Sequence, residues 1–189
     1  MGGAHSSVSL RPMNKSSVLA IAAFGLFAAT ALAQTAGTVH TRQAMVDGVN
    51  PAAVAIWDVT NAAMDDEGGY DAALIDADGW SKLAEAAQLL EIYGKRMAEA
   101  QTIVAGGPDL VSGELPPGVA SQAEIQAMID ADPDGFRAVS ADMAQQAGAL
   151  RAAAKARDAA AAGDIAAGID GACQACHTRY WFLQDPAGS

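Results

Sequence analysis

Several kinds of residue are scarce in this sequence, and each scarcity excludes a class of protein. Two cysteines among 189 residues are too few for the disulfide framework of a small secreted domain. Only 11 Lys and Arg stand against 22 Asp and Glu, so the clustered cations that bind nucleic-acid phosphates are not expected. Aromatic residues make up 5% of the chain, and runs of Val, Ile or Thr are few. A protein built mainly of strands is therefore not expected.

Alanine is abundant where these residues are missing. Alanine loses no side-chain entropy when it enters a helix, so the composition favours an all-α fold. The acidic balance fits a soluble protein that meets basic partners, although charge does not determine the fold. The length suits one domain with a core of its own.

The first 33 residues have the three parts of a secretory signal peptide. A basic start is followed by a short apolar stretch over 18–29 and then by the small residues Ala31 and Ala33. A membrane anchor is the alternative, but the stretch is shorter than the ~20 residues of a span. We predict export to the periplasm and cleavage after Ala33. This removes two basic and no acidic residues, so 9 basic and 22 acidic residues remain, a net charge of −13.

The rest of the chain, 34–189, is predicted to form one domain. Apolar residues recur there at steps of three and four, which is the signal of helices that bury one face. No strand with convincing alternation appears. The expected fold is an antiparallel four-helix bundle, with long helices at about Thr38–Met64, Asp78–Val104, Asp132–Gly163 and Asp164–Tyr180.

Two prolines follow a polar residue that could cap a helix. Asn50-Pro51 interrupts the first helical segment, so either the helix is kinked there or a second helix begins with Asn50 as its N-cap. Asp132-Pro133 predicts the N-cap and the first turn of the third long helix.

A loop is predicted over 105–120, where Gly-Gly-Pro, Ser-Gly and Pro-Pro sequences occur. Ser121 and Glu124 then have the spacing of a capping box, which predicts a short helix after the loop. The tail 185–189 is expected to fray.

The only two cysteines belong to the sequence Cys173-Gln174-Ala175-Cys176-His177, the Cys-x-x-Cys-His signature of covalent haem attachment. Two thiols three residues apart on a helical turn can reach the two vinyl groups of one porphyrin. The histidine that follows lies under the iron and supplies a nitrogen ligand. Attachment takes place outside the cytoplasm, so the motif and the signal peptide support each other. We predict one haem c on Cys173 and Cys176, with His177 as an iron ligand.

Two other uses of a cysteine pair fit less well. A thioredoxin-like pair stands at the start of a helix after a strand, whereas this pair lies deep in the last predicted helix. A structural zinc site needs four ligands, and beyond these three the mature chain offers only His40 as a further Cys or His.

A haem motif near the C-terminus of a four-helix bundle resembles the class II c-type cytochromes, that is, cytochrome c-prime and its low-spin relatives. The segment from Cys173 to Tyr180 and the pair Arg42-Gln43 carry the specific likeness. The resemblance implies that Arg42 contacts a haem propionate. The sequence departs from the family at Trp181-Phe182-Leu183, which replaces a basic tail, and at Pro51, which breaks a normally continuous helix.

The second axial ligand of the iron decides between electron transfer and gas binding. A methionine thioether opposite histidine keeps the iron six-coordinate and raises its potential. Met45 is our candidate, although in low-spin relatives the ligand stands about one residue later, where this chain has Val46. An open or Val46-blocked site is the next alternative, His40 is the third, and methionine is also common core filler. Met97 and Met143 are expected in the core.

We therefore expect a one-electron carrier and not an enzyme, because no nucleophile–base pair or paired carboxylates appear. Its partners would be redox proteins, with a second copy of this chain as a further candidate. The rivals are a five-coordinate haem protein that binds nitric oxide or carbon monoxide, and a subunit docked on a larger redox complex through Trp181-Phe182-Leu183. Five aromatic residues are expected to pack, against the porphyrin among other groups: Trp57, Trp80, Phe136, Tyr180 and Trp181.

Overall fold

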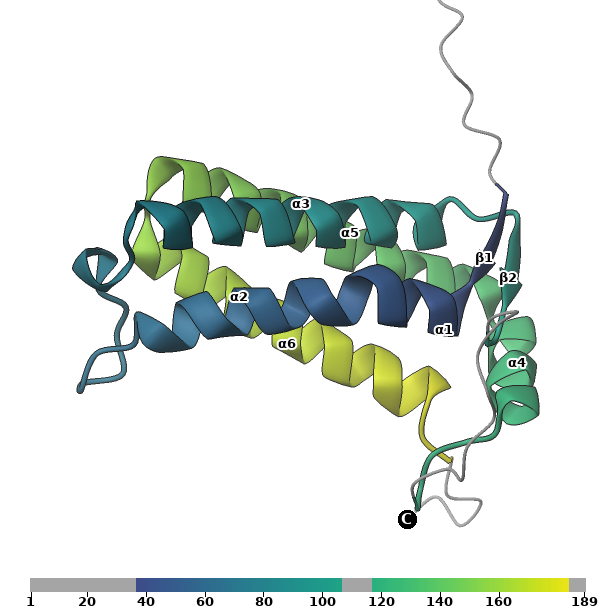
Figure 1. Ribbon diagram of the computed structural model, residues 1–189. Coiled ribbons are helices and arrows are strands. Elements are labelled where there is room, and N and C mark those ends of the chain that lie inside the picture. The colour runs from purple at the N-terminus through teal and green to yellow at the C-terminus, as the bar shows by residue number, and fades with distance from the viewer. Residues whose placement is uncertain (1–36, 107–116, 184–189) are drawn as a thin grey trace, which may run out of the picture. The chain divides into compact units, whose positions relative to one another are not determined.

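The computed structural model describes residues 37–106 and 117–183, and these form a four-helix bundle (Figure 1). The predicted signal peptide 1–33, most of the predicted loop and the tail 185–189 lie outside the described residues. The elements in chain order are β1 (Thr38–His40), α1 (Thr41–Ala44), η1 (Met45–Val49), α2 (Asn50–Ala62), η2 (Ala72–Leu74), α3 (Ala77–Ala98), β2 (Thr102–Val104), α4 (Gln122–Ala131), α5 (Pro133–Ala156) and α6 (Ala159–Tyr180).

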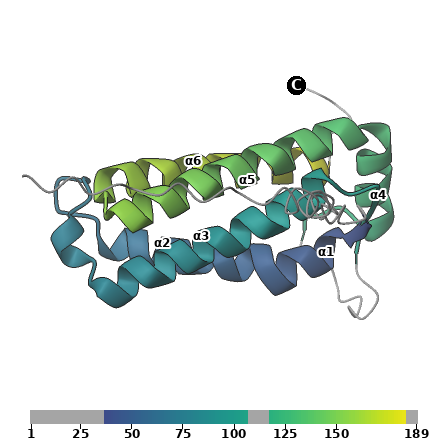
Figure 2. The same cartoon turned by 90° about the horizontal axis from the view of Figure 1, so that it is seen from above.

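The bundle is antiparallel, as predicted, with the continuous run of α1, η1 and α2 as its first helix and α3, α5 and α6 as the others (Figures 1 and 2). The α3–α5 contact is the most extensive, followed by α5–α6 and α2–α3. Small residues let α3 and α5 approach closely, since a Cβ at Gly94 would lie 2.9 Å from the Cβ of Ala144. Ile56, Leu83, Leu90 and Leu150 are completely buried between the helices.

Of the two interpretations of Asn50-Pro51, the N-cap interpretation was wrong, because the helix continues through these residues with an irregular hydrogen-bond register. Asn50 has helical angles, φ −66° and ψ −47°, and is not an N-cap. Its N–H donates to the carbonyl of Met45, five residues earlier, so the segment Met45–Val49 is one turn of π-helix. Proline has no N–H and its ring crowds the carbonyl four residues back, which is a known cause of such irregularity.

The expectation of no strand was wrong at one end of the bundle. β1 and β2 form a two-stranded parallel sheet in which Val39 pairs with Ile103. The second predicted helix therefore ends at Ala98, and not near Val104. Each strand has three residues, too short for alternation to be visible in a sequence.

Two helix boundaries also differ from the prediction. α3 is capped by Asp76, whose carboxylate accepts a hydrogen bond from Gly79 N–H at 2.7 Å, two residues before the expected start. α5 ends at Ala156, because Arg157 turns left-handed with φ 56°, and Asp158 caps α6. The predicted break near 163 lies inside α6. Alanines surround the true break, so helix propensity does not mark it.

The predicted caps at 121 and 132 are confirmed. Ser121 and Glu124 form the reciprocal capping box of α4, and Asp132 caps α5 with Pro133 in its first turn. α4 is tied to β2 through Gln126, whose side-chain amide donates to Ile103 C=O at 3.2 Å and accepts from the N–H of Ala105, just after β2, at 2.7 Å. These contacts hold α4 beside the end of the bundle that carries the cysteine motif.

Candidate functional site

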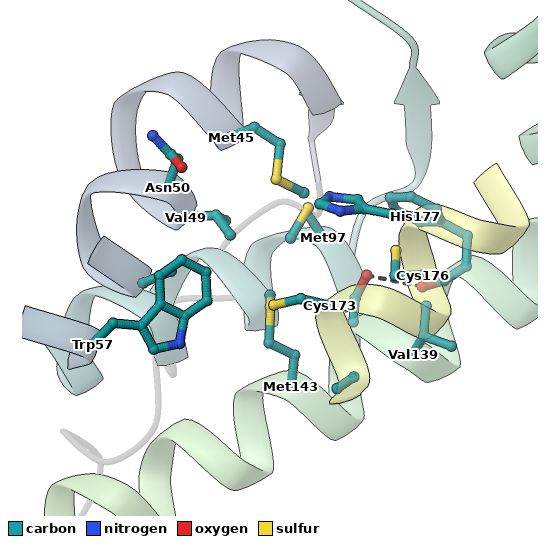
Figure 3. A pocket seen from close by; sticks show the side chains of 14 residues that line it. Met45, Val49, Asn50, Trp57, Met97, Val139, Met143, Cys173, Cys176 and His177 are labelled. Atoms are coloured by element: carbon teal, nitrogen blue, oxygen red, sulfur yellow. Dashed lines mark hydrogen bonds between the residues drawn. The ribbon is translucent and has the colours of Figure 1, made fainter. Parts of the chain in front are cut away.

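A cavity opens inside the bundle between η1, α2, α3, α5 and α6 (Figure 3). Its volume is about 90 Å³, and its lining is almost entirely apolar. A porphyrin is larger, but three of the lining residues are methionines, whose unbranched side chains adapt readily to a new neighbour. The lining residues are Met45, Val49, Asn50, Ala53, Trp57, Met97, Phe136, Val139, Ser140, Met143, Ala172, Cys173, Cys176 and His177.

Both cysteines lie on the cavity side of α6 and are free thiols. Burial, with a smaller effect of the Asp170 charge, raises the pKa of Cys173. Burial, together with Cys173, raises the pKa of Cys176 to about 11. Reactive redox cysteines have lowered pKa values, so this environment does not suit the thioredoxin-like alternative. Two partly buried thiols beside an apolar cavity instead fit a group that is held there permanently.

His177 occupies the next position on α6 and also lines the cavity. Burial lowers the pKa of its imidazole, which favours the neutral form that a metal ligand must have. Its ring centroid lies 6.0 Å from that of Trp181 and 6.5 Å from that of Phe182. The backbone of this segment pairs with 118–120, for example through Ala120 N–H to Trp181 C=O at 2.9 Å. These two aromatic residues therefore pack beside the histidine.

Met45 approaches from the opposite wall of the cavity. It lies at the start of η1, and its side chain extends toward the imidazole of His177 (Figure 3). Val46, the other residue considered for this position, is 51% exposed and does not line the cavity. The structure thus brings together four of the predicted site residues: Cys173, Cys176, His177 and Met45.

Arg42 and His40 are not among the residues that line the cavity. Arg42 lies about one turn before Met45, is half-buried, and donates its backbone N–H to Gly106 C=O at 3.1 Å. His40 belongs to β1, where it pairs with Val104. Among the described residues, no three His, Cys, Asp or Glu side chains come together so that they could hold a metal ion.

Several lining residues were not predicted to be part of the site. Met97 and Met143 are core residues, as expected, but they also face the cavity. Asn50 lines it as well, on the wall formed by η1 and α2. Of the aromatic residues expected to pack, Trp57 and Phe136 line the cavity, whereas Trp80 and Tyr180 are buried elsewhere. The period of three and four marks buried positions but does not show which of them border a cavity.

A Cys-x-x-Cys-His motif on the last helix of a four-helix bundle, facing an apolar cavity, defines a c-type haem protein. The family model described as cytochrome C' matches residues 37–181, and the chain belongs to this family. No curated protein and no solved structure matches the chain at a significant level.

Proteins of the cytochrome C' family bind covalently attached haem c, and haem c is the cofactor of this chain. The family works in electron transfer or gas binding, is generally non-enzymatic, and is typically periplasmic. Among the described residues, no helix is long and apolar enough to cross a membrane.

Proposed function

We propose that this protein is a periplasmic carrier of single electrons, with one haem c linked to Cys173 and Cys176 and ligated by His177 and Met45. The observation that carries the proposal is the convergence of an imidazole and a thioether on one apolar cavity from facing helices (Figure 3). Haem iron supplies the one-electron redox chemistry, and a histidine–methionine ligand pair raises its potential.

The described residues fit this cofactor by their chemistry. The two thiols and the imidazole lie within five consecutive residues of one helix, and the wall is apolar apart from Asn50, Ser140 and the motif itself. The hydroxyl of Ser140 donates to Phe136 C=O at 2.8 Å, so it does not add an unsatisfied polar group. An apolar lining excludes water from the porphyrin faces and helps to set the potential. Arg42, about one turn from Met45, remains our candidate for a haem propionate.

A carrier also needs partners that can approach it. The net charge of the mature chain, −13 if cleavage occurs after Ala33, would steer basic redox proteins toward it. We propose such a partner, which would dock transiently and less tightly at high salt. Of the residues that motivate the alternative of a permanent docking tail, Trp181 packs beside His177, whereas Phe182 and Leu183 are 39% and 51% exposed.

The absorption spectrum of the holoprotein, with and without carbon monoxide, tests the proposal. The chain is produced together with a cytochrome maturation system, and its mass is measured first. We expect the mass of the polypeptide plus one haem, and a reduced protein that is low-spin and ignores carbon monoxide. Met45→Ala should convert it to a high-spin form that binds carbon monoxide, because the thioether ligand is lost.

Other results would contradict parts of the proposal. Prompt binding of carbon monoxide by the unaltered protein means a vacant sixth position, which favours the gas-binding alternative. An unchanged low-spin spectrum in Met45→Ala excludes Met45 as the ligand. Met64→Ala is the matched control, because Met64 is 46% exposed and does not line the cavity.

A further inference from the structure

The π-turn η1 decides which side chain of the first helix faces the cavity. Side chains of an α-helix are spaced by about 100°. If the first helix were an unbroken α-helix, residue 46 would lie within about 20° of Ala53 around the helix axis. Residue 45 would lie about 80° from Ala53 around the same axis. The protein shows the opposite arrangement, because Met45 and Ala53 line the cavity and Val46 is 51% exposed.

The extra residue of the π-turn accounts for this exchange. Asn50 N–H bonds to Met45 C=O, five residues back, instead of to Val46 C=O, four residues back. One more residue is therefore accommodated between the two ends of the turn, and Met45 takes the angular position that residue 46 would have had. The strict spacing of four among Met45, Val49 and Ala53 on the cavity wall agrees with a locally wider helix.

Pro51 stands two residues after Val49, the last residue of this turn, and favours the turn. In an α-helix, residue 51 would donate to Asp47 C=O, but proline has no N–H and its ring would crowd that carbonyl. The π-turn relieves the crowding by changing the hydrogen-bond register just before the proline. By contrast Pro133 lies in the first turn of α5, where no such bond is lost.

Gly48 lets the wider turn pack against α3. A Cβ at Gly48 would overlap the ring of Tyr93, so the turn lies directly on that ring. Gly48 and Val49 are both buried, and η1 contacts α3 along this side. The close packing of Gly48 on Tyr93 therefore also stabilises the π-turn. Pro51 is not the only residue that determines which way Met45 points.

We propose that Pro51 is a positioning residue for the haem: it keeps η1 in the π-register, which places Met45 and not Val46 opposite His177. The proposal rests on the proposed function only in so far as Met45 is an iron ligand. The position of the side chain itself can be tested separately.

Register exchange tests the proposal in the holoprotein. Pro51→Ala restores an N–H and removes the ring, so we expect an α-register in which Met45 rotates by about 100° out of the site. Most of the low-spin signal should be lost, and carbon monoxide should bind. Adding Val46→Met to Pro51→Ala should restore the low-spin spectrum. The double variant Met45→Val with Val46→Met, which keeps Pro51, should not show a low-spin spectrum. Its methionine at position 46 faces solvent as long as Pro51 is present.

A second readout follows the side chains without using the spectrum. Oxidation of each methionine by hydrogen peroxide is measured by mass spectrometry. Met45 should be protected in the unaltered holoprotein and oxidised several-fold faster in Pro51→Ala. A methionine at position 46 should be oxidised quickly when Pro51 is present and should be protected in Pro51→Ala. Local unfolding would expose both positions and would not produce this exchange. Pro133→Ala is the matched control and should change neither the spectrum nor the oxidation of Met45.

The outcomes separate the two proposals. If Met45→Ala stays low-spin while the oxidation patterns exchange as expected, ligation by Met45 is wrong and the positioning role of Pro51 stands. If Met45→Ala becomes high-spin but Pro51→Ala keeps a low-spin spectrum and a protected Met45, the positioning role is wrong and ligation stands. A low-spin spectrum in the Met45→Val and Val46→Met exchange with Pro51 present would also overturn the positioning role.

Discussion

The two walls of the cavity are built in different ways. On one side α6 is an unbroken α-helix that presents Cys173, Cys176 and His177 within little more than one turn. On the other side the helix from Thr41 to Ala62 contains a π-turn, and the side chain that faces the cavity depends on it. In the regular helix α6, residue spacing is enough to predict which side chains face the cavity. In the helix that contains the π-turn, residue spacing is not enough. The comparison predicts that substitutions on the two walls will differ in kind.

The largest effect on stability is expected where the irregular wall meets α3. Gly48→Ala would place a Cβ in the ring of Tyr93, so the bundle should lose about 1–3 kcal/mol of unfolding free energy. Gly171→Ala on the regular wall is the matched control, because a Cβ there has no neighbour within 4 Å. It should stabilise α6 by up to about 1 kcal/mol. Urea unfolding of the two variants measures both changes, and equal effects would remove this distinction between the walls.

A smaller effect is expected where the regular wall ends. The hydroxyl of Tyr180 donates to the carboxylate of Asp132 at 2.9 Å, and its ring packs edge-on against Phe136 at a centroid distance of 5.4 Å. Burial, with the hydrogen bond to Asp132, raises the pKa of Tyr180 to about 12. Tyr180→Phe keeps the ring and removes the hydrogen bond, so we expect a loss of about 1 kcal/mol. Thermal unfolding checks this, and a loss as large as that in Gly48→Ala would mean that the irregular wall is not the more sensitive one.

The smallest effect concerns an ion cluster between α3 and α5 that belongs to neither wall. Lys95 Nζ lies 2.6 Å from Glu91 Oε1, and Arg151 Nη2 lies 3.2 Å from Glu91 Oε2. The hydrogen bond from Lys95, aided by the charge of Arg151, lowers the pKa of Glu91 below its ordinary value of 4.5. The carboxylate is therefore stabilising above pH 4.5, and the contribution is lost as the pH falls through the lowered pKa.

Comparing the unaltered protein with Glu91→Gln tests this pH dependence. The difference in unfolding free energy should be constant at neutral pH and should shrink as the pH falls below 4.5. Asp58→Asn, which removes the exposed pair with Lys82, serves as the control and should change stability little at any pH. Neither variant should change the haem spectrum. A changed spectrum would show that the walls of the cavity are not the only parts that set it.

The sequence predicted most of the bundle, because buried helix faces leave a period of three and four that is visible without a structure. Caps at Ser121 and Asp132 were also visible, since each depends on residues close together in the chain. The boundary at Arg157 was missed because alanine is equally helical on both sides of it. The pairing of β1 with β2 was missed because it joins segments about 60 residues apart, each too short to show alternation.

The sequence by itself determined the cysteine–histidine motif and the helical class, because each follows from neighbours along the chain, and the resemblance to the class II c-type cytochromes made Met45 a candidate ligand. Only the tertiary structure decided that Met45, and not Val46, extends toward His177. The reason is that two residues act on the register in different ways: Pro51 through the N–H that it lacks within the first helix, and Gly48 through the missing Cβ that lets the turn pack on Tyr93 of α3, 45 residues away. Such a choice depends on which backbone register packs best, and that is settled only when the helices meet.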